Sequence, residues 1–169
     1  YTQVLAFDEI NKTITVEPGV IRDELNLFLK PFGLFFGPNT STSNRCMIGG
    51  MVGNNSSGST SIKYGVTRDK VLKIDGFLSD GTSVIFNELT SEEFKTKLKE
   101  DSLEGKIYKS LYNELSQKEV QLEIKNQFPK PSIHRRNTGY AVDELLDSDL
   151  FGGKNNKINV AKLLSGSEG

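Results

Sequence analysis

The segment GPNTSTSNRCMIGGMVGNNSSGSTS, residues 37–61, decides the fold of this chain. Eighteen of its 25 residues are Gly, Ser, Thr or Asn, and Arg45 is its only charged residue. Because glycine has no Cβ, it lets the main chain approach a neighbour closely. Successive free N–H groups form a concave nest that suits phosphate. The composition therefore predicts a loop that holds a phosphate-bearing ligand.

Two familiar phosphate-binding motifs do not fit this segment. Residues 53–58 have the G-x-x-x-x-G spacing of a P-loop, but Ser59 and Thr60 follow where Lys and Ser/Thr are required. Without that Lys the β- and γ-phosphates lose their counter-charge, so a P-loop ATPase is rejected. Residues 49–53 read GGMVG, which is not G-x-G-x-x-G, and no good strand directly precedes them. This argues against a Rossmann turn.

The alternative is a plain surface loop. Against it stands the apolar motif MIGGMV at residues 47–52, because polar surface loops do not usually contain such a run. The motif favours a buried turn that packs on one side and faces a ligand on the other. A buried loop must satisfy its main-chain polar groups, and a polyanionic ligand would accept hydrogen bonds from its N–H groups.

The composition is that of a globular protein with a core. Of the 169 residues 36% are hydrophobic and 25% charged, with a net charge of −1, so no basic field attracts nucleic acid. No apolar run is long enough to span a membrane. Cys46 is the only cysteine, which fits a reducing compartment and predicts a cytoplasmic location. We expect Cys46 to pack structurally, with a reactive thiol as the alternative.

The first third of the chain predicts a strand pair and a helix. Residues 3–7 and 13–17 are β-prone runs around a polar turn, with Ile14 on one face of the second run. A helix follows Pro18-Gly19 and ends at Lys30-Pro31. Its apolar residues lie at i, i+4, i+7 and i+8, on one face: Ile21, Leu25, Phe28 and Leu29.

The remainder predicts a second hairpin and several helices. Residues 71–78 and 82–86 flank the turn Ser79-Asp80-Gly81. Helices are predicted at 90–100 after a capping box from Thr90 to Glu93, then at 103–116, 118–128, 143–146 and 160–164, the last capped by Asn159. Residues 132–142 and 147–157 are predicted to be irregular. The fold class is α+β, mainly antiparallel sheet flanked by helices.

Four motifs occur in order at residues 16–25 (VEPGVIRDEL), 38–58 (PNTSTSNRCMIGGMVGNNSSG), 63–72 (KYGVTRDKVL) and 163–169 (LLSGSEG). With them the chain closely resembles the FAD-linked oxidases related to D-lactate dehydrogenase and the glycolate oxidase D subunit. The wording at 44–58 and the RRNTGY at 135–140 are most similar to long bacterial members with a fused iron–sulfur region. The resemblance implies the second lobe of a PCMH-type FAD-binding domain. Because the chain opens within a strand and ends within GSEG, we expect a fragment, 1–169, that lacks the first lobe and the C-terminal substrate and iron–sulfur regions.

The resemblance also implies the residues that bind FAD. Residues 38–42 would line the pyrophosphate path, 46–50 would run along the flavin and ribityl, 54–58 would continue that wall, and 64–65 would close the cleft. The implied cofactor-binding residues are Pro38, Thr40, Ser41, Thr42, Cys46, Met47, Ile48, Gly49, Gly50, Asn54, Asn55, Gly58, Tyr64 and Gly65. No catalytic residue and no metal ligand is predicted in this chain.

The family's activity implies that the parent oxidises a D-2-hydroxy acid such as D-lactate or glycolate by hydride transfer to flavin N5. The implied partners are FAD and this small substrate. The parent would be cytoplasmic, with peripheral attachment to a membrane as an alternative; its electron acceptor and oligomeric state stay open. Two other functions are considered: another FAD enzyme of this fold, resembling UDP-N-acetylenolpyruvylglucosamine reductase, and a non-catalytic nucleotide-binding module.

The other polar residues that stand out have competing interpretations. We expect His134, the only histidine, to have no catalytic role. Arg135 and Arg136 either reach a carboxylate or FAD phosphate or are solvated. We interpret Arg68-Asp69 as a structural ion pair.

Overall fold

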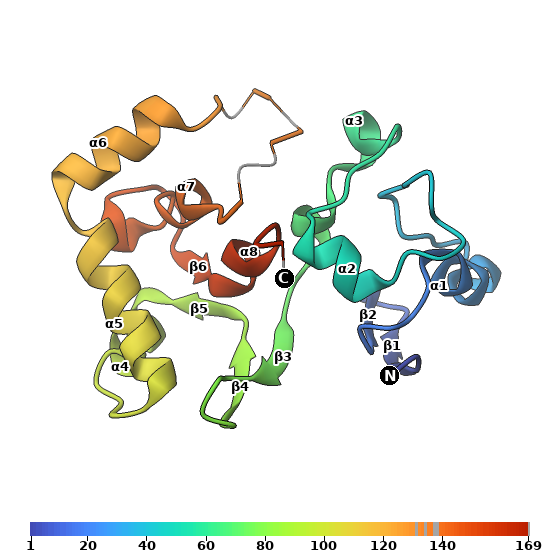
Figure 1. Cartoon of the computed structure of the whole chain (residues 1–169), viewed down its shortest axis with the longest axis horizontal. Coiled ribbons are helices and arrows are strands. Elements are labelled where there is room, and N and C mark those ends of the chain that lie inside the picture. The colour runs from blue at the N-terminus through green and yellow to red at the C-terminus, as the bar shows by residue number, and fades with distance from the viewer. Residues whose placement is uncertain (131, 134, 137–138, 169) are drawn as a thin grey trace. The chain divides into compact units, whose positions relative to one another are not determined.

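The computed structural model describes residues 1–130, 132–133, 135–136 and 139–168, and divides them into two compact units. Unit 1 comprises the described residues of 1–70, 131–139 and 165–169, and unit 2 comprises 71–130 and 140–164. Each unit is therefore assembled from segments that lie far apart in the sequence (Figure 1).

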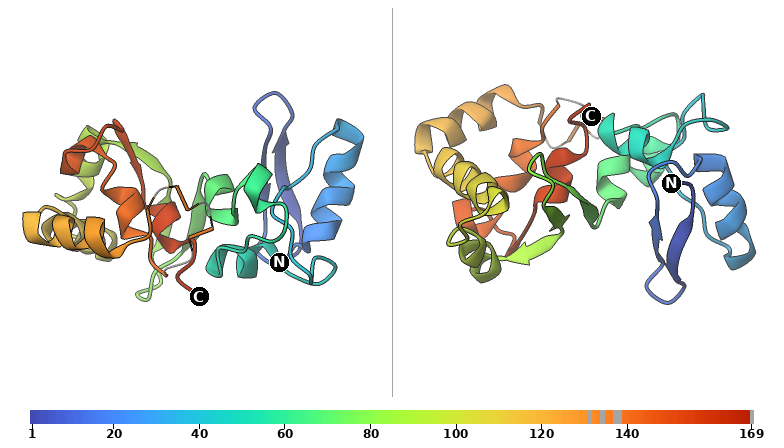
Figure 2. Two further views of the ribbon diagram at one scale, coloured as in Figure 1. Left: turned by 90° about the horizontal axis from the view of Figure 1, so that it is seen from above. Right: turned by 60° about the horizontal axis from the view of Figure 1, so that its bottom comes forward.

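Unit 1 begins with an antiparallel hairpin and a helix. Strands β1 (Val4–Asp8) and β2 (Thr13–Val16) pair, and α1 (Arg22–Leu29) lies beside them, as Figure 2 shows. Val20, Leu25 and Leu29 are buried between α1 and the apolar side chains of the hairpin. The predicted hairpin and helix are confirmed, although Phe28 of the expected apolar face is 40% exposed and contacts the rings of Phe7 and Phe32 instead.

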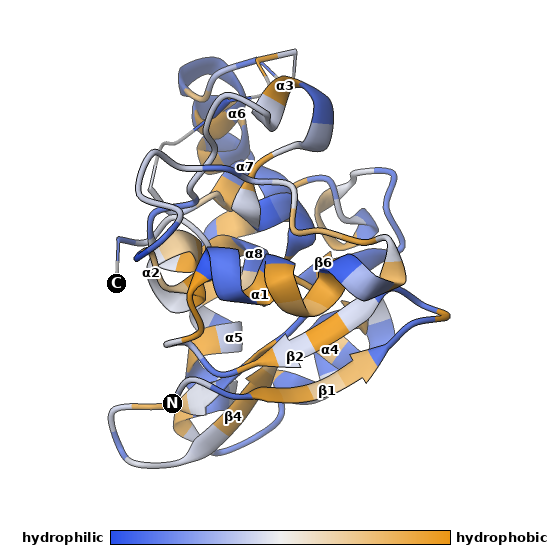
Figure 3. Ribbon diagram, turned by 90° about the vertical axis from the view of Figure 1, so that its right-hand side faces the viewer, coloured by the Kyte–Doolittle hydropathy of each residue, from blue (hydrophilic) through white to orange (hydrophobic). Residues whose placement is uncertain are grey.

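Helix α1 ends just before Lys30-Pro31, as the sequence predicts. The α-helix stops at Leu29, and a single 3₁₀ turn, η1 (Lys30–Phe32), continues to Gly33. Gly33 has a φ of 67°, a left-handed conformation that glycine adopts without strain. Apolar residues are spread over the hairpin and over α1 in Figure 3, which shows both elements from the side.

The remaining elements of unit 1 are short and were not predicted. They are α2 (Ile48–Gly53), α3 (Ser61–Tyr64) and the 3₁₀ helix η2 (Thr67–Lys70). The prediction of a turn at 47–52 is wrong in its local form, because residues 48–53 are helical. Glycine is a poor helix former, but Met51 is almost fully buried, so tertiary packing outweighs the low propensity of this sequence.

Unit 2 contains two further antiparallel strand pairs. Strands β3 (Ile74–Phe77) and β4 (Ser83–Phe86) form the predicted hairpin, in which Gly81 has a φ of 82° and Asp80 Oδ1 accepts a hydrogen bond from the N–H of Thr82 at 2.9 Å. Strands β5 (Glu88–Thr90) and β6 (Lys157–Asn159) pair across a long stretch of sequence. This second pair was not predicted, and the expected polar loop at 147–157 is corrected to include the 3₁₀ helix η3 (Asp149–Phe151) and the first residue of β6.

The helices of unit 2 agree with the sequence patterns. They are α4 (Ser91–Lys97), α5 (Leu103–Leu115), α6 (Lys118–Gln127), α7 (Val142–Leu145) and α8 (Val160–Leu164). Thr90 and Glu93 form the predicted capping box at the start of α4. Asn159 caps α8, because its Oδ1 accepts the N–H of Ala161 at 2.9 Å. The α+β class is thus supported, with three two-stranded antiparallel sheets among the described residues.

None of the helices in the described part of the chain combines the length and the apolar character that a transmembrane segment requires.

Tyr108 of α5 lies at the centre of the core of unit 2, with the ring of Phe94 against it at 5.1 Å between centroids. Its hydroxyl is buried and has no hydrogen-bond partner among the described residues. Burial raises the pKa of this phenol, so the hydroxyl stays neutral at ordinary pH. An unsatisfied buried hydroxyl is a net cost to folding.

Removing this hydroxyl should therefore stabilise unit 2. We expect Tyr108→Phe to raise the free energy of unfolding by about 1 kcal/mol, measured by urea denaturation. The matched control is Tyr112→Phe on the same helix, where the ring is half-buried, and it should change stability by less than about 0.5 kcal/mol. A loss of stability in Tyr108→Phe would show that the hydroxyl has a partner.

Candidate functional site

The first turns of α1 hold the start of the Gly/Ser/Asn segment. The guanidinium of Arg22 donates from Nε to the carbonyl of Pro38 at 3.1 Å and from Nη2 to the carbonyl of Phe36 at 3.2 Å. Asn26, one turn later, accepts the N–H of Phe36 at 2.7 Å. Residues 36–38 are therefore fixed by side chains of a helix rather than by a strand partner.

The N-terminal end of α1 also binds the later part of this segment, residues 43–46. The N–H groups of Arg22 and Asp23 donate to the carbonyls of Cys46 and Ser43 at 3.0 and 3.2 Å. Asp23 Oδ2 accepts the hydroxyl of Ser43 at 3.0 Å, and its Oδ1 pairs with Arg22 Nη1 at 2.9 Å. The stretch from 36 to 46 is thus tied to α1 at both ends.

Helix α2 is placed by the turn before α1. The N–H groups of Ile48 and Gly49 donate to the carbonyls of Val20 and Pro18 at 2.9 and 2.8 Å. A Cβ on Gly49 would lie 2.7 Å from the Cβ of Pro18, whereas a Cβ on Gly50 would have no neighbour within 4 Å. The two adjacent glycines therefore differ: Gly49 is small because Pro18 packs on it, and Gly50 presents a bare main chain to open space.

The end of the segment returns alongside its beginning. The N–H of Asn39 donates to the carbonyl of Ser57 at 2.9 Å, and the hydroxyl of Thr60 donates to the carbonyl of Gly37 at 2.8 Å. Gly58, with a φ of 93°, leaves room for the main chain of Asn39, which any Cβ there would strike. Residues 37–39 and 57–60 thus run side by side.

Asn55 and Arg68 are buried and form a hydrogen-bonded junction within unit 1. Asn55 accepts the N–H of Arg68 at 2.9 Å and donates from Nδ2 to the carbonyl of Arg136 at 3.2 Å. Arg68 donates from Nε to the carbonyl of Ser165 at 2.8 Å and from Nη2 to the carbonyl of Gly139 at 3.1 Å. One arginine thereby joins three sequence-distant stretches of unit 1.

The expected Arg68-Asp69 ion pair is replaced by other partners. Arg68 binds the carbonyls named above, and Asp69 Oδ2 accepts the N–H of Val66 at 2.9 Å. The same carboxylate lies where a Cβ on Gly65 would be, and Gly65 has a φ of 77°. Asp69 therefore shapes the turn after α3, and Gly65 must be small for that reason.

Hydrogen bonds within the chain already use much of the predicted nest. The N–H groups of Asn39, Ser43, Arg45, Cys46, Ile48, Gly49, Met51, Asn54, Asn55 and Ser56 all donate to main-chain carbonyls. Those of Thr40, Ser41 and Thr42 have no acceptor among the described residues. The hydroxyl of Thr40 lies 3.4 Å from that of Thr42 and 3.2 Å from Cys46 Sγ. The N–H groups of Ser57, Gly58, Ser59 and Thr60 likewise have no acceptor among the described residues. Successive available donors therefore lie in two runs, at residues 40–42 and 57–60.

The predicted cofactor-binding residues differ in exposure, although all lie in unit 1. Four are exposed: Ser41, Met47, Gly50 and Asn54. Eight are half-buried: Thr40, Thr42, Cys46, Ile48, Gly49, Gly58, Tyr64 and Gly65. Pro38 and Asn55 are buried among other residues of the protein. The assignment of all of them to FAD stays a prediction.

Two of the half-buried residues pack against neighbours in the segment. Tyr64 makes an edge-to-face contact with Phe35 at 5.0 Å between centroids, and its Cβ would be 2.6 Å from a Cβ on Gly37. Cys46 Sγ lies 3.5 Å from Met51 Sδ, so it packs against a buried thioether, in line with the structural role expected for it.

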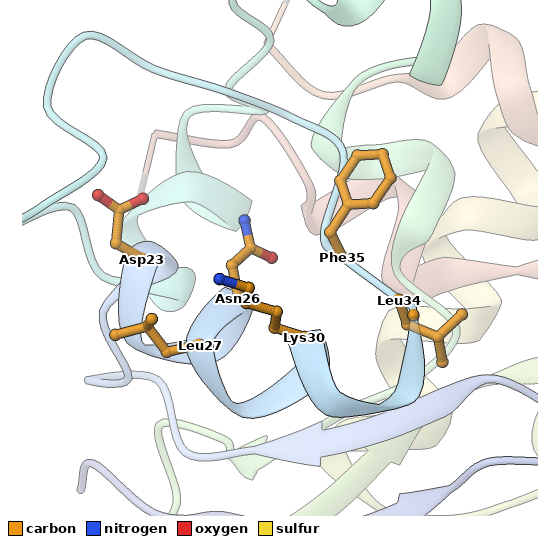
Figure 4. A pocket seen from close by; sticks show the side chains of 7 residues that line it. Asp23, Asn26, Leu27, Lys30, Leu34 and Phe35 are labelled. Atoms are coloured by element: carbon orange, nitrogen blue, oxygen red, sulfur yellow. The ribbon is translucent and has the colours of Figure 1, made fainter.

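A groove of about 620 Å³ lies along α1 and the stretch that follows it. Asp23, Asn26, Leu27, Lys30, Gly33, Leu34 and Phe35 line it. In Figure 4 its side chains come from α1 and from the stretch that follows it. None of the predicted cofactor-binding residues lines this groove, so it is distinct from the segment at 38–58.

The basic stretch after Pro129 is described only in part. His134 lies outside the described residues, so its expected non-catalytic role stays a prediction. Arg135 is exposed and Arg136 is half-buried, and the carbonyl of Arg136 accepts the hydrogen bond from Asn55 Nδ2. The choice between a ligand contact and solvation at Arg135 and Arg136 stays open.

Sequence similarity to known proteins identifies the family of this chain. Residues 1–87 match the family described as "FAD binding domain". The chain is 38% identical over 156 residues to the D-2-hydroxyglutarate dehydrogenase of Escherichia coli, covering 92% of this chain and 14% of that protein. It is 33% identical over 171 residues to the same enzyme of Haemophilus influenzae, covering 99% and 16%. The glycolate oxidase subunit GlcD of Bacillus subtilis is 42% identical over 79 residues, covering 47% and 17%.

The chain therefore belongs to the FAD-binding domain family of FAD-linked oxidases and dehydrogenases. This confirms the resemblance drawn from the four motifs and the prediction of FAD as the cofactor. The matched residues 1–87 run from β1 to just past β4 and include the whole segment at 37–61. The chain spans only 14 to 17% of the length of these three relatives.

The buried Arg68 should be essential to the stability of unit 1. In Arg68→Gln the carbonyls of Gly139 and Ser165 lose a charged, forked donor, and we expect a loss of about 3 kcal/mol in the free energy of unfolding. The control is Arg45→Gln, an exposed arginine of the same unit, which should cost less than about 0.5 kcal/mol. Equal effects of the two changes in urea denaturation would contradict the structural role.

Proposed function

We propose that this chain is the FAD-binding part of a flavin-dependent dehydrogenase that oxidises a D-2-hydroxy acid, and that its segment at 38–58 contacts FAD. The observation that carries the proposal is the run of main-chain N–H groups at Thr40, Ser41 and Thr42, which lack acceptors among the described residues. Such successive donors are suited to a diphosphate. The hydroxyls of these three residues would add further donors.

The remaining residues of the segment also fit a flat, elongated cofactor. Gly50 offers a main-chain surface with open space where a side chain would be, which permits the close approach of an aromatic ring system. Met47, half-exposed at the start of α2, adds apolar surface beside it. The flavin, when bound, supplies the hydride acceptor, and the roles of these residues are to bind and orient it.

The names of the relatives guide the choice of substrate. Those that match nearly the whole chain are D-2-hydroxyglutarate dehydrogenases, whereas the glycolate oxidase subunit and a mitochondrial D-lactate dehydrogenase match less than half of it. A D-2-hydroxy acid with a second carboxylate is therefore the first candidate, and D-lactate and glycolate are the next.

The wider context of the chain is part of the same proposal. It would be the second lobe of a PCMH-type domain within a longer protein, with substrate and iron–sulfur regions outside residues 1–169 and a cytoplasmic location. A reductase of the same flavin fold and a nucleotide-binding module without activity are the alternatives, and none of the relatives named above favours them.

Gly50 gives the sharpest test of FAD binding. In the full-length protein that carries this chain, Gly50→Val should weaken FAD binding by roughly 10- to 100-fold, because the new side chain occupies the place of the ring. Valine is no worse than glycine in a helix, so α2 should persist. The measurement is titration of the apoprotein with FAD, followed by flavin fluorescence.

Gly76→Val is the matched control, since a Cβ on Gly76 also meets nothing within 4 Å and this strand residue lies outside the segment. It should bind FAD like the unaltered protein. Gly49→Val is less informative, because the packing of Pro18 would itself be disturbed. Full FAD binding by Gly50→Val would mean that this segment does not contact the flavin.

The substrate can be tested separately by anaerobic reduction of the bound flavin. D-2-hydroxyglutarate should reduce it faster than D-lactate or glycolate, and L-2-hydroxyglutarate should reduce it at least about tenfold more slowly. Reduction by NADPH but by no hydroxy acid would favour the reductase alternative, and absence of bound flavin would favour the nucleotide-binding module.

A further inference from the structure

We infer that Arg22 and Asp23 are positioning residues for FAD: they hold residues 36–46 in the shape that exposes the N–H donors of 40–42. This inference rests on the proposed function, because it assigns the device that prepares the diphosphate-binding segment. Neither residue is expected to touch the cofactor. Their role is to fix the segment before the cofactor arrives.

The two side chains act on opposite ends of the same segment. The Arg22 guanidinium, 13% exposed, takes the carbonyls of Phe36 and Pro38, and Asp23 takes the hydroxyl of Ser43. The two are joined by the pair between Arg22 Nη1 and Asp23 Oδ1 at 2.9 Å. One continuous set of hydrogen bonds therefore spans the donors at 40–42 from both sides.

Burial contributes little to the shape of this segment. Residues 39–44 read NTSTSN and contain no apolar side chain larger than a threonine methyl group, so they gain little from burial. Local turns bind the carbonyls of Thr40 and Thr42, and Asp23 of α1 binds the carbonyl and the hydroxyl of Ser43. Ordering a segment before binding spares the cofactor that entropic cost, and this raises affinity.

Arginine is required here for a geometric reason. Its planar fork donates in three fixed directions, to Phe36, to Pro38 and to Asp23, and a lysine ammonium at the end of a flexible stem cannot reproduce that pattern. Arg22→Lys therefore keeps the charge and removes the fork. It should weaken FAD binding by about tenfold or more if positioning is the role.

Asp23 distinguishes positioning from simple charge. Asp23→Asn and Glu24→Gln each remove one negative charge from the start of α1, but only Asp23 holds Ser43 and Arg22. If charge alone mattered, both changes would tighten the binding of anionic FAD to a similar extent. Positioning predicts weaker binding in Asp23→Asn, by about fivefold or more, and a change below about twofold in Glu24→Gln.

The experiment uses the full-length protein and measures the Kd for FAD together with hydrogen–deuterium exchange of residues 39–46 in the FAD-free state. Arg22→Lys and Asp23→Asn should both weaken FAD binding and speed exchange in these residues. Ser43→Ala, which removes a single hydroxyl and leaves no buried charge, should do the same to a smaller extent. It provides the test if the Arg22 variant does not fold.

Two results would overturn the inference. One is a Kd within about twofold of the unaltered protein for Arg22→Lys, Asp23→Asn and Ser43→Ala. The other is tighter binding in Asp23→Asn and Glu24→Gln alike. If Gly50→Val loses FAD while the α1 variants keep it, only the positioning role fails. If Gly50→Val keeps FAD as well, the proposed contact itself fails.

Discussion

The structure of unit 1 depends on satisfying the main-chain polar groups of a segment that has few apolar side chains. Residues 36–58 cannot be held by burial alone, so side chains from other elements supply the hydrogen bonds. Arg22 binds two carbonyls at the start of the segment, those of Phe36 and Pro38. Arg68 binds the carbonyls of Gly139 and Ser165, from later stretches of unit 1. Asn55 joins the end of the segment to Arg68 through its Oδ1, and its Nδ2 donates to the carbonyl of Arg136. The successive donors that these contacts leave available are the N–H groups of residues 40–42 and 57–60.

Local patterns predicted most of the elements, because each depends on residues close in sequence. The turn at 79–81 and the alternation around it predicted the β3–β4 hairpin, and the Thr90 and Glu93 capping box predicted the start of α4. The pairing of β5 with β6 was missed, since it joins three residues at 88–90 to three at 157–159 and neither run carries a signal of its own. Helix α2 was missed because two of its first three residues are glycines, and only tertiary contacts keep it helical.

The sequence motifs selected residues 38–58 as the candidate site, and this assignment stays a prediction. These residues lie within the stretch that matches the family. Sequence alone could not show that Pro38 and Asn55 face the protein, or that Gly49 and Gly50 have different reasons to be glycine. Arg22 and Asp23 were passed over because their only sequence signal is a charged pair at the start of a helix, which usually marks a solvated face. Their role follows from the position of Phe36, Pro38 and Ser43 in space.

A segment that binds phosphate through its main chain has to be rigid and must also leave its N–H groups accessible. Large apolar side chains would give rigidity but would cover the N–H groups, whereas glycine and serine leave them exposed and give little rigidity. Unit 1 separates the two requirements: residues 40–42 carry the donors, and order comes from arginine and aspartate side chains on α1, which lie outside the segment. Because these anchors act on carbonyls and on a hydroxyl, they consume none of the N–H groups of 40–42. These contacts can therefore order the segment while they leave its N–H groups available, as the proposed contact with a diphosphate requires.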